Sequence, residues 1–169
     1  MNLKDFIKHR GTLRNIKRFG MEFTLHEQNL CEHGYSTASL FSLLCDHKNI
    51  KIESIDLWRV MQHDFAEVFT GDLNQAIKKE VPYYWEKIED QMVPEGVCYK
   101  DNDLKVYLGH KKYPIFLFAD ALDAFLYTKD EIGMGNFHLL KAHIYYKDKL
   151  KSLDKELYEF IINLEELNG

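Results

Sequence analysis

Apolar residues recur along this chain at helical spacing, and the alternation that is typical of strands is scarce. Only three prolines and nine glycines interrupt the sequence, which favours helices joined by short connections. We therefore expect an all-α fold, a helical bundle of about six to eight helices. The predicted helices cover residues 5–19, about 32–47, 54–70, 82–92, 114–127, 136–150 and 154–167.

Two segments depart from this pattern. Residues 21–29, between the first two predicted helices, lack helical periodicity. Residues 94–113 are polar, and we interpret them as a connection that holds a short hairpin or irregular coil. By contrast, the stretch IFLFADALDAFLY after Pro114 is so apolar that it predicts a buried central helix.

Length and composition limit the possible classes of protein. The 169 residues suffice for one well-packed domain, 1–169, and are too few for two. No apolar run reaches the roughly 20 residues that cross a bilayer, and residues 1–10 lack the apolar core of a signal peptide. We expect a cytoplasmic protein without membrane partners, located in the host cytoplasm if a phage encodes it.

The formal net charge of -5 supplies no extended basic face, so nucleic acid is not an expected partner. A local basic cluster of Arg14, Lys17 and Arg18 is either a solvated face or a contact for a small anionic ligand. The three cysteines show no CxxC spacing, which excludes a recognisable zinc ribbon and fits reduced thiols.

Candidate chemistry centres on the adjacent pair His63-Asp64, which is followed by Glu67 and Asp72 in MQHDFAEVFTGD. Imidazole and carboxylate groups bind borderline and hard divalent metals, and a nearby carboxylate that is not a ligand can take a proton from water. On a continuous helix, His63 and Glu67 would lie on one face. His33 offers a second imidazole from another predicted helix. The combination predicts metal-dependent hydrolase chemistry, whereas His63 alone would more simply line the core.

Asp120 is the second unusual residue, because it lies in FLFADALDAFL, where burial of an unpaired carboxylate is costly. Coordination of a cation would remove that cost. Asp123, three residues later, could be the inward group instead, or both carboxylates could face a wet groove. The spacing alone does not choose between these alternatives.

The order His33, His63-Asp64, Asp120 resembles the H...HD...D signature of the HD-domain phosphohydrolase superfamily. HDFAEVFTGDL is similar to the HD-x-x-E-x-x-T-G-D motif of bacterial HD-domain 5′-deoxynucleotidases, and ADALDAFL is similar to their ADAL element. An Arg-Trp pair, an Asn and a Glu-His dipeptide of that family correspond here to Arg18-Phe19, Asn29 and Glu32-His33. The resemblance spans roughly residues 14 to 127.

The resemblance implies one divalent metal ion, whether Mn, Co, Mg, Zn or Fe, with its ligands at His33, His63, Asp64 and Asp120. It assigns this role to Asp120 rather than to Asp123. Glu67 would orient or deprotonate the attacking water. Asp72 would assist Glu67 or hold the sugar 3′-hydroxyl.

Substrate contacts follow from the same resemblance. Arg18 and Lys78 would meet the phosphate, where the planar fork of an arginine suits a tetrahedral anion. Base preference would depend on Phe19 and Met21. Two positions depart from the family pattern, because Phe19 stands where relatives often carry Trp and Leu117 where they often carry Lys. One expected phosphate contact is therefore missing.

These roles imply hydrolysis of the 5′-phosphate ester of deoxyribonucleoside 5′-monophosphates. One alternative is cleavage of a deoxynucleoside triphosphate, as in the compact phage HD-domain dATP triphosphohydrolases, which are similarly short. Another is a noncatalytic nucleotide-binding sensor, although the complete ligand set and Glu67 argue against it. The resemblance also implies a homo-oligomer, a dimer or a larger ring.

Overall fold

The computed structural model describes residues 3–20, 22–72, 84, 87, 91–92 and 101–166. These residues form an all-α fold, which confirms the predicted fold class. In chain order the α-helices are α1 (Leu3–Leu13), α2 (Leu30–His47), α3 (Ser54–Met61), α4 (Glu67–Thr70), α7 (Asp101–Gly133), α8 (Leu140–Leu153) and α9 (Lys155–Glu166). A short 3-10 helix, η1 (Phe137–Leu139), precedes α8.

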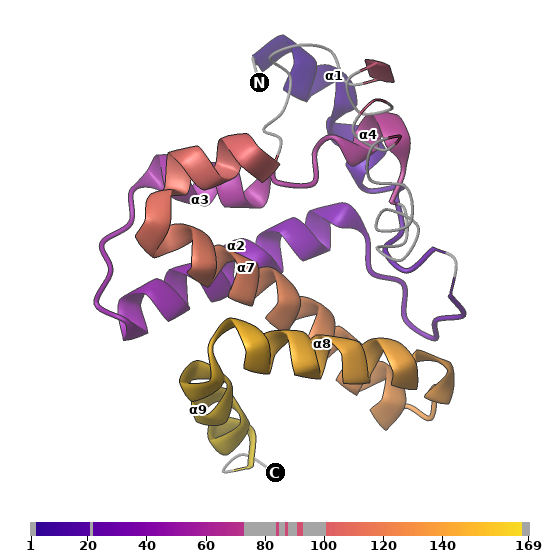
Figure 1. The fold of residues 1–169 in the computed structure, drawn as a ribbon. Helices are drawn as coiled ribbons and strands as arrows, with labels where there is room; N and C mark the ends of the chain where they lie inside the picture. Colours follow the sequence, from indigo (N-terminus) through magenta and orange to yellow (C-terminus); the bar gives the residue numbers. More distant parts are fainter. Residues whose placement is uncertain are drawn as a thin grey trace.

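The centre of the fold is α7, which packs against α2 and against α8 (Figure 1). Apolar side chains of these helices meet between them, and Phe41, Phe118 and Leu150 are almost inaccessible to solvent. The central helix predicted after Pro114 is thus confirmed. A smaller apolar cluster around Leu13 and Phe65 joins α1 to α4.

The start of α2 is fixed by a capping box. The Asn29 side chain accepts hydrogen bonds from the N–H groups of Cys31 and Glu32, at 3.0 and 3.1 Å. In return, the Glu32 carboxylate accepts from the N–H of Asn29 at 3.0 Å. These bonds satisfy backbone donors that the first helical turn leaves open. They place His33 in that first turn, where it is completely buried.

The first predicted helix was expected to reach residue 19, and this is wrong, because α1 ends at Leu13. After the helix the backbone pairs with the segment before α2 instead. The N–H of Arg18 donates to the carbonyl of Gln28 at 2.8 Å, and the N–H of Leu30 donates to the carbonyl of Ile16 at 3.1 Å. These long-range bonds replace the helical ones and bring Arg18 beside the start of α2.

The helix predicted over residues 54–70 is also interrupted. It ends at Met61, and a tight turn covers residues 62–66 before α4 begins. The N–H of His63 bonds to the carbonyl three residues earlier, at Val60, at 3.2 Å, which is the tighter 3-10 pattern. The end of α3 touches α2 at Gly34, where an added Cβ would lie 2.6 Å from the carbonyl oxygen of Met61. The absence of a side chain at Gly34 lets the turn approach α2.

Residues 94–113 were predicted to be an irregular connection, and this is wrong from residue 101 onward. Helix α7 begins at Asp101, and Leu104 and Leu108 bury their side chains one turn apart. A kink at Gly109, with φ 68° and ψ 179°, separates this part from the apolar stretch. The glycine makes that backbone conformation possible, whereas the sequence interpretation followed the polar composition of the segment. Most of the helix predicted over 82–92 lies outside the described residues.

The two helices predicted at the C-terminal end are confirmed as α8 and α9. Asp154 lies between them and accepts a hydrogen bond from the N–H of Leu157 at 2.9 Å, as an N-cap does. Its carboxylate also lies 3.0 Å from Nζ of Lys48, which ties α9 to the end of α2. None of the described helices combines the length and the apolar character that a membrane span requires.

Candidate metal centre

Two imidazoles and one carboxylate, those of His33, His63 and Asp64, converge between α2 and the turn after α3, and Asp120 of α7 lies beside both imidazoles. Nε2 of His33 lies 3.2 Å from Nε2 of His63, and it lies 3.4 Å from Asp64 and 3.3 Å from Asp120. Nε2 of His63 lies 3.3 Å from Asp64 and 3.8 Å from Asp120. The structure thus brings together the four residues that the sequence singles out as ligands.

The donor set fits a divalent metal ion. Imidazole nitrogens and carboxylate oxygens suit first-row divalent metals. Two ligands at roughly 2.1 Å from one ion lie about 3 Å apart when they are neighbours, close to the spacings here. Nδ1 of His63 lies 2.7 Å from the carbonyl oxygen of Val60. When Nδ1–H donates to that carbonyl, the neutral imidazole keeps its lone pair on Nε2, toward the cluster.

The cluster concentrates charge. Burial raises the pKa of the Asp120 carboxyl, but hydrogen bonds with the two histidines hold that pKa well below its usual value. Burial likewise raises the pKa of Asp64, and His63, His33 and Arg18 lower it below the ordinary value. For His63, burial lowers the pKa, but Asp64 and Asp120 raise it to about 9. Both carboxylates are therefore ionised at neutral pH, as metal ligands must be.

Arg18 lies at the edge of the cluster with a side chain only 12% exposed. Its guanidinium contacts Nδ1 of His33 and lies 3.6 Å from Asp123. Burial lowers the pKa of the guanidinium, but Asp64 and Asp120 raise it above its usual value. A largely buried, permanently charged arginine beside the candidate ligand groups is suited to binding a phosphate.

Phe19 follows Arg18 in an unusual backbone conformation, with φ 56°. Its N–H donates to the Asp72 carboxylate at 3.1 Å, which ties the loop after α4 to this turn. The Phe19 ring stacks on Tyr127, with centroids 5.2 Å apart, and meets Tyr146 edge-on at 6.2 Å. A left-handed conformation at a bulky residue is costly, so the Asp72 bond and the ring contacts hold the turn in place.

The remaining predicted residues fall in two groups. Glu67 begins α4 with a buried side chain, and its N–H donates to the carbonyl of Asp64 at 3.0 Å. It therefore follows the ligand pair directly, although His63 lies in a turn and not on the same continuous helix. Met21 and Lys78, predicted as substrate contacts, lie outside the described residues.

The two carboxylates between which the spacing could not choose both point inward. Asp120 approaches Nε2 of His33, and Asp123 approaches Nδ1 of the same ring at 2.6 Å. Asp123 is 5% exposed, so it does not face a wet groove. Gln28, also buried, donates a hydrogen bond from Nε2 to Asp123 at 3.0 Å. The sequence does not single out Gln28, because it lies in a segment without periodicity.

Lys149 is a second residue that sequence reasoning missed. Its Nζ lies 3.6 Å from Oδ2 of Asp120, whereas Oδ1 of the same carboxylate faces the imidazoles. It belongs to α8, which carries several other lysines. No local pattern distinguishes Lys149 from them, and only the packing of α8 on α7 brings it to the site. A cation thus stands beside Asp120 although Leu117, on the same helix as Asp120, supplies none.

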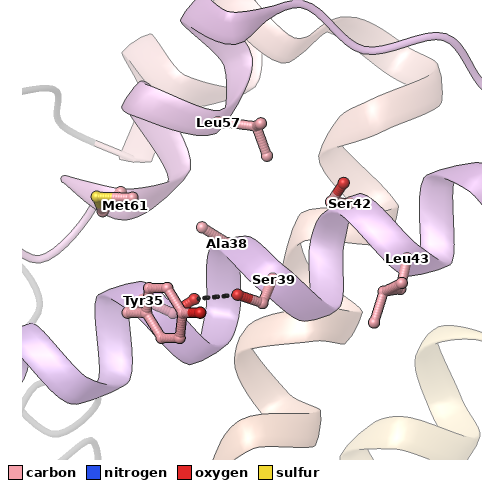
Figure 2. A pocket seen from close by; sticks show the side chains of 7 residues that line it. All are labelled: Tyr35, Ala38, Ser39, Ser42, Leu43, Leu57 and Met61. Atoms are coloured by element: carbon pink, nitrogen blue, oxygen red, sulfur yellow. Dashed lines mark hydrogen bonds between the residues drawn. The ribbon is translucent and has the colours of Figure 1, made fainter.

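A groove of about 390 Å³ between α2 and α3 is separate from this centre. Its lining consists of Tyr35, Ala38, Ser39, Ser42, Leu43, Leu57 and Met61. Figure 2 shows the α2 side chains along one side, with Leu57 and Met61 of α3 opposite. With about 100° between successive helical residues, Tyr35 and Ser39 lie on the face of α2 opposite to His33. The groove therefore does not open onto the metal ligands.

Comparison with known proteins identifies the family of the chain. A family model described as 5′-deoxynucleotidase YfbR-like matches residues 5–165. A 5′-deoxynucleotidase of Pectobacterium atrosepticum is 30% identical over 166 residues, which cover 85% of this chain and 82% of the relative. The family model thus extends over the four candidate ligands and nearly all of the C-terminal helices.

Two solved structures are similar in fold. An HD-domain phosphohydrolase from Listeria innocua has a TM-score of 0.70 at 20% identity, over 95% of this chain and 82% of that one. The HD phosphohydrolase DatZ of cyanophage S-2L, bound to dA and one catalytic Zn²⁺ ion, has a TM-score of 0.70 at 19% identity, over 98% of each chain. The match of the family model to nearly the whole chain, together with this fold, establishes that the chain belongs to the YfbR-like 5′-deoxynucleotidase family and is an HD-domain phosphohydrolase.

Proposed function

We propose that this enzyme hydrolyses the 5′-phosphate ester of deoxyribonucleoside 5′-monophosphates, with one divalent metal ion held by His33, His63, Asp64 and Asp120. The observation that carries the proposal is the convergence of these side chains, because His33, His63 and Asp64 each offer a ligand atom within 4.8 Å of the others. The fourth, Asp120, lies 3.3 Å from Nε2 of His33. Family membership and the donor set support the same activity.

Different side chains around the metal site have different roles in the reaction. When bound, the metal supplies positive charge that polarises a phosphoryl oxygen and acidifies a water molecule. Glu67, buried directly after the ligand pair, takes the proton from the attacking water. The Arg18 guanidinium binds the phosphate and offsets the charge that builds on it during the reaction. The nucleoside leaves with its 5′-hydroxyl restored.

Lys149 adds a second cation on the phosphate side. Its contact with Asp120 puts Nζ at the rim of the ligand cluster, and its side chain is 28% exposed, so a substrate oxygen can reach it. Lys78 keeps the phosphate role that the resemblance implies, although it lies outside the described residues. Phosphate binding by Arg18 and Lys149 from opposite parts of the chain would compensate for the lysine missing at position 117.

The sugar and base are proposed to lie beside Phe19. Its stack on Tyr127 forms an aromatic wall next to Arg18, and aromatic faces favour contact with a base or a deoxyribose ring. Asp72 supports this wall through the backbone of Phe19, and it retains the proposed contact with the sugar 3′-hydroxyl. Met21 is a further proposed contact outside the described residues.

Product analysis tests the activity. Purified protein is incubated with each deoxynucleoside mono- and triphosphate, with Mn²⁺, Co²⁺ or Mg²⁺ and with a chelator control, and products are separated by ion exchange. Chelator-sensitive phosphate release from monophosphates alone supports the proposal. Nucleoside plus tripolyphosphate from one triphosphate would indicate the triphosphohydrolase alternative, and no product from any nucleotide would indicate a sensor.

Two further expectations accompany the activity. We expect a homo-oligomer, a dimer or a larger ring, which sedimentation velocity at several concentrations tests. We also expect the protein to act in the cytoplasm, where deoxynucleotides are found. The choice among Mn, Co, Mg, Zn and Fe is tested by elemental analysis of protein purified without added metal.

A further inference from the structure

Two carboxylates on α7 approach opposite nitrogens of one imidazole. Asp120 lies 3.3 Å from Nε2 of His33, on the side of the ligand cluster, and Asp123 lies 2.6 Å from Nδ1 on the other side. The imidazole is completely buried and Asp123 is 5% exposed, so solvent cannot replace the contact between Asp123 and Nδ1. The ring is held between residues one helical turn apart.

We propose that Asp123 is a positioning residue that keeps the proton of His33 on Nδ1 and thereby presents the Nε2 lone pair to the metal. The inference rests on the metal site of the proposed function. Asp123 itself does not touch the metal, because it lies on the opposite side of the ring from the converging ligand atoms. Its action is exerted through His33.

The tautomer follows from the hydrogen-bonding capacity of the two groups. A neutral imidazole carries one N–H and one lone pair, and an ionised carboxylate can only accept. At 2.6 Å the carboxylate oxygen and Nδ1 are hydrogen-bonded, and because the carboxylate can only accept, this bond requires the proton on Nδ1. The Arg18 guanidinium also contacts Nδ1 but can only donate, so in the proposed tautomer it pairs with the Asp123 oxygen, 3.6 Å away, and not with Nδ1. Nε2 is then the acceptor nitrogen and the ligand. A hydrogen-bonded carboxylate also makes the ring a stronger donor to the metal.

Asp123 is in turn oriented by the segment that carries Arg18. Gln28 donates from Nε2 to the same Asp123 oxygen at 3.0 Å, and the Gln28 carbonyl accepts the N–H of Arg18 at 2.8 Å. The Arg18 guanidinium lies 3.6 Å from that oxygen. One buried carboxylate therefore connects the orientation of a metal ligand with the position of the proposed phosphate-binding arginine.

Metal affinity measured without nucleotide tests this proposal separately from the activity. Co²⁺ is titrated into chelator-treated protein and followed by visible absorption, with thermal melting of the metal-free protein as a folding check. D123N keeps an oxygen that can accept from Nδ1, so we expect Co²⁺ binding to be about tenfold weaker. D123L has no acceptor for Nδ1, so we expect Co²⁺ binding to be about 100-fold weaker. D130N, an exposed position on the same helix, is the matched control and should bind as wild type.

The positioning role is supported if Co²⁺ affinity falls in D123N and falls further in D123L, while D130N binds Co²⁺ as the wild type does. The melting temperatures of the metal-free variants should be preserved. Wild-type affinity in both Asp123 variants would overturn it. If D123L does not fold, Q28M supplies the second test, because it removes the donor that orients Asp123 and should weaken Co²⁺ binding several-fold. If the wild-type protein binds Co²⁺ but hydrolyses no nucleotide, the proposed activity is rejected and the inference about Asp123 stands.

Discussion

Two carboxylate centres on α7 differ in the groups that surround them. Glu131 is inaccessible to solvent and receives hydrogen bonds from the N–H groups of Leu25 and His26 and from the Asn136 amide, at 2.7, 2.6 and 2.6 Å. Asp120 instead lies with a second carboxylate, Asp64, against the Nε2 atoms of two imidazoles. The first carboxylate is satisfied by backbone and amide donors, whereas the second set gathers imidazole nitrogens and carboxylate oxygens, the groups that bind a divalent cation.

The groups around each carboxylate separate a structural charge from a functional one. The Glu131 centre holds the loop between Arg18 and α2, because Asn136 also donates to the carbonyl of Phe23 at 2.8 Å and the Tyr127 hydroxyl donates to that of His26. The Asp120 centre joins α2, the turn after α3 and α7 through imidazole nitrogens and carboxylate oxygens, with Lys149 of α8 at its edge. A complete set of protein donors marks an anchor, and a convergence of ligand atoms marks a binding site.

The largest expected effect comes from removing a charged ligand. Asp64→Asn and Asp120→Asn each leave a neutral amide that binds divalent metals poorly, so we expect metal content near zero and turnover reduced by about 1,000-fold or more. Elemental analysis and phosphate release measure the two quantities. Asp130→Asn, on the exposed side of α7, should change neither. Full metal occupancy in both ligand variants would contradict the site.

The sequence allowed most helices to be predicted from local patterns, and those patterns together with the family resemblance named the four candidate ligands that the structure brings close to one another. His63-Asp64 and Asp120 stand out as polar groups in apolar surroundings, and α2, α8 and α9 follow helical periodicity. The early ends of α1 and α3 were not predictable, because bonds to distant segments compete with the helix there. For α3 the deciding contact is Met61 against Gly34, which no local pattern reveals.

The supporting residues were harder to predict for the same reason. Asp123 was visible as an alternative to Asp120, but its place at Nδ1 of His33 depends on how α7 crosses α2. Gln28 lies in an irregular segment, and Lys149 is one of several lysines on α8. Spacing along one helix identifies candidates for a site, whereas the groups that orient them come from packing between helices.

The next largest effect concerns the proposed base. Glu67→Gln keeps the shape of the side chain and removes its capacity to take a proton, so we expect kcat to fall by about 100-fold or more. Metal content and nucleotide affinity should stay at the wild-type level, as elemental analysis and equilibrium binding will measure. Near-normal kcat would remove Glu67 from the mechanism. Loss of metal instead would make Glu67 part of the ligand shell.

A smaller effect is expected at Lys149. Lys149→Met keeps the length of the side chain and removes one charged contact with phosphate, so we expect KM for the monophosphate to rise about tenfold. Metal content should not change, because Lys149 contacts Asp120 only through the oxygen that faces away from the imidazoles. Lys147→Met, at an exposed position on the same helix, is the control. An unchanged KM would limit Lys149 to a surface ion pair.

The smallest effect on catalysis is expected from the anchor. Glu131→Gln turns one oxygen into an NH₂ group that faces N–H donors, so we expect a loss of about 2 kcal/mol in the free energy of unfolding, or roughly 6 °C in Tm. Metal content should remain at the wild-type level, in contrast with Asp120→Asn. Thermal melts in the presence of chelator measure the loss without a contribution from metal binding. Loss of metal from this variant would contradict the separation of the two centres.

The pH dependence of that loss identifies its cause. Burial raises the pKa of Glu131, but the hydrogen bonds from Asn136, Leu25 and His26 lower it below its usual value. The ionised anchor therefore stabilises the folded state fully above the unfolded pKa of about 4.3. That contribution is lost as the pH falls through the lower, folded pKa. We expect the gap in Tm between wild type and Glu131→Gln to narrow from pH 7 toward pH 3.5, because the wild type alone loses this ionised contact. A gap that stays constant over this range would mean that shape, and not charge, makes Glu131 an anchor.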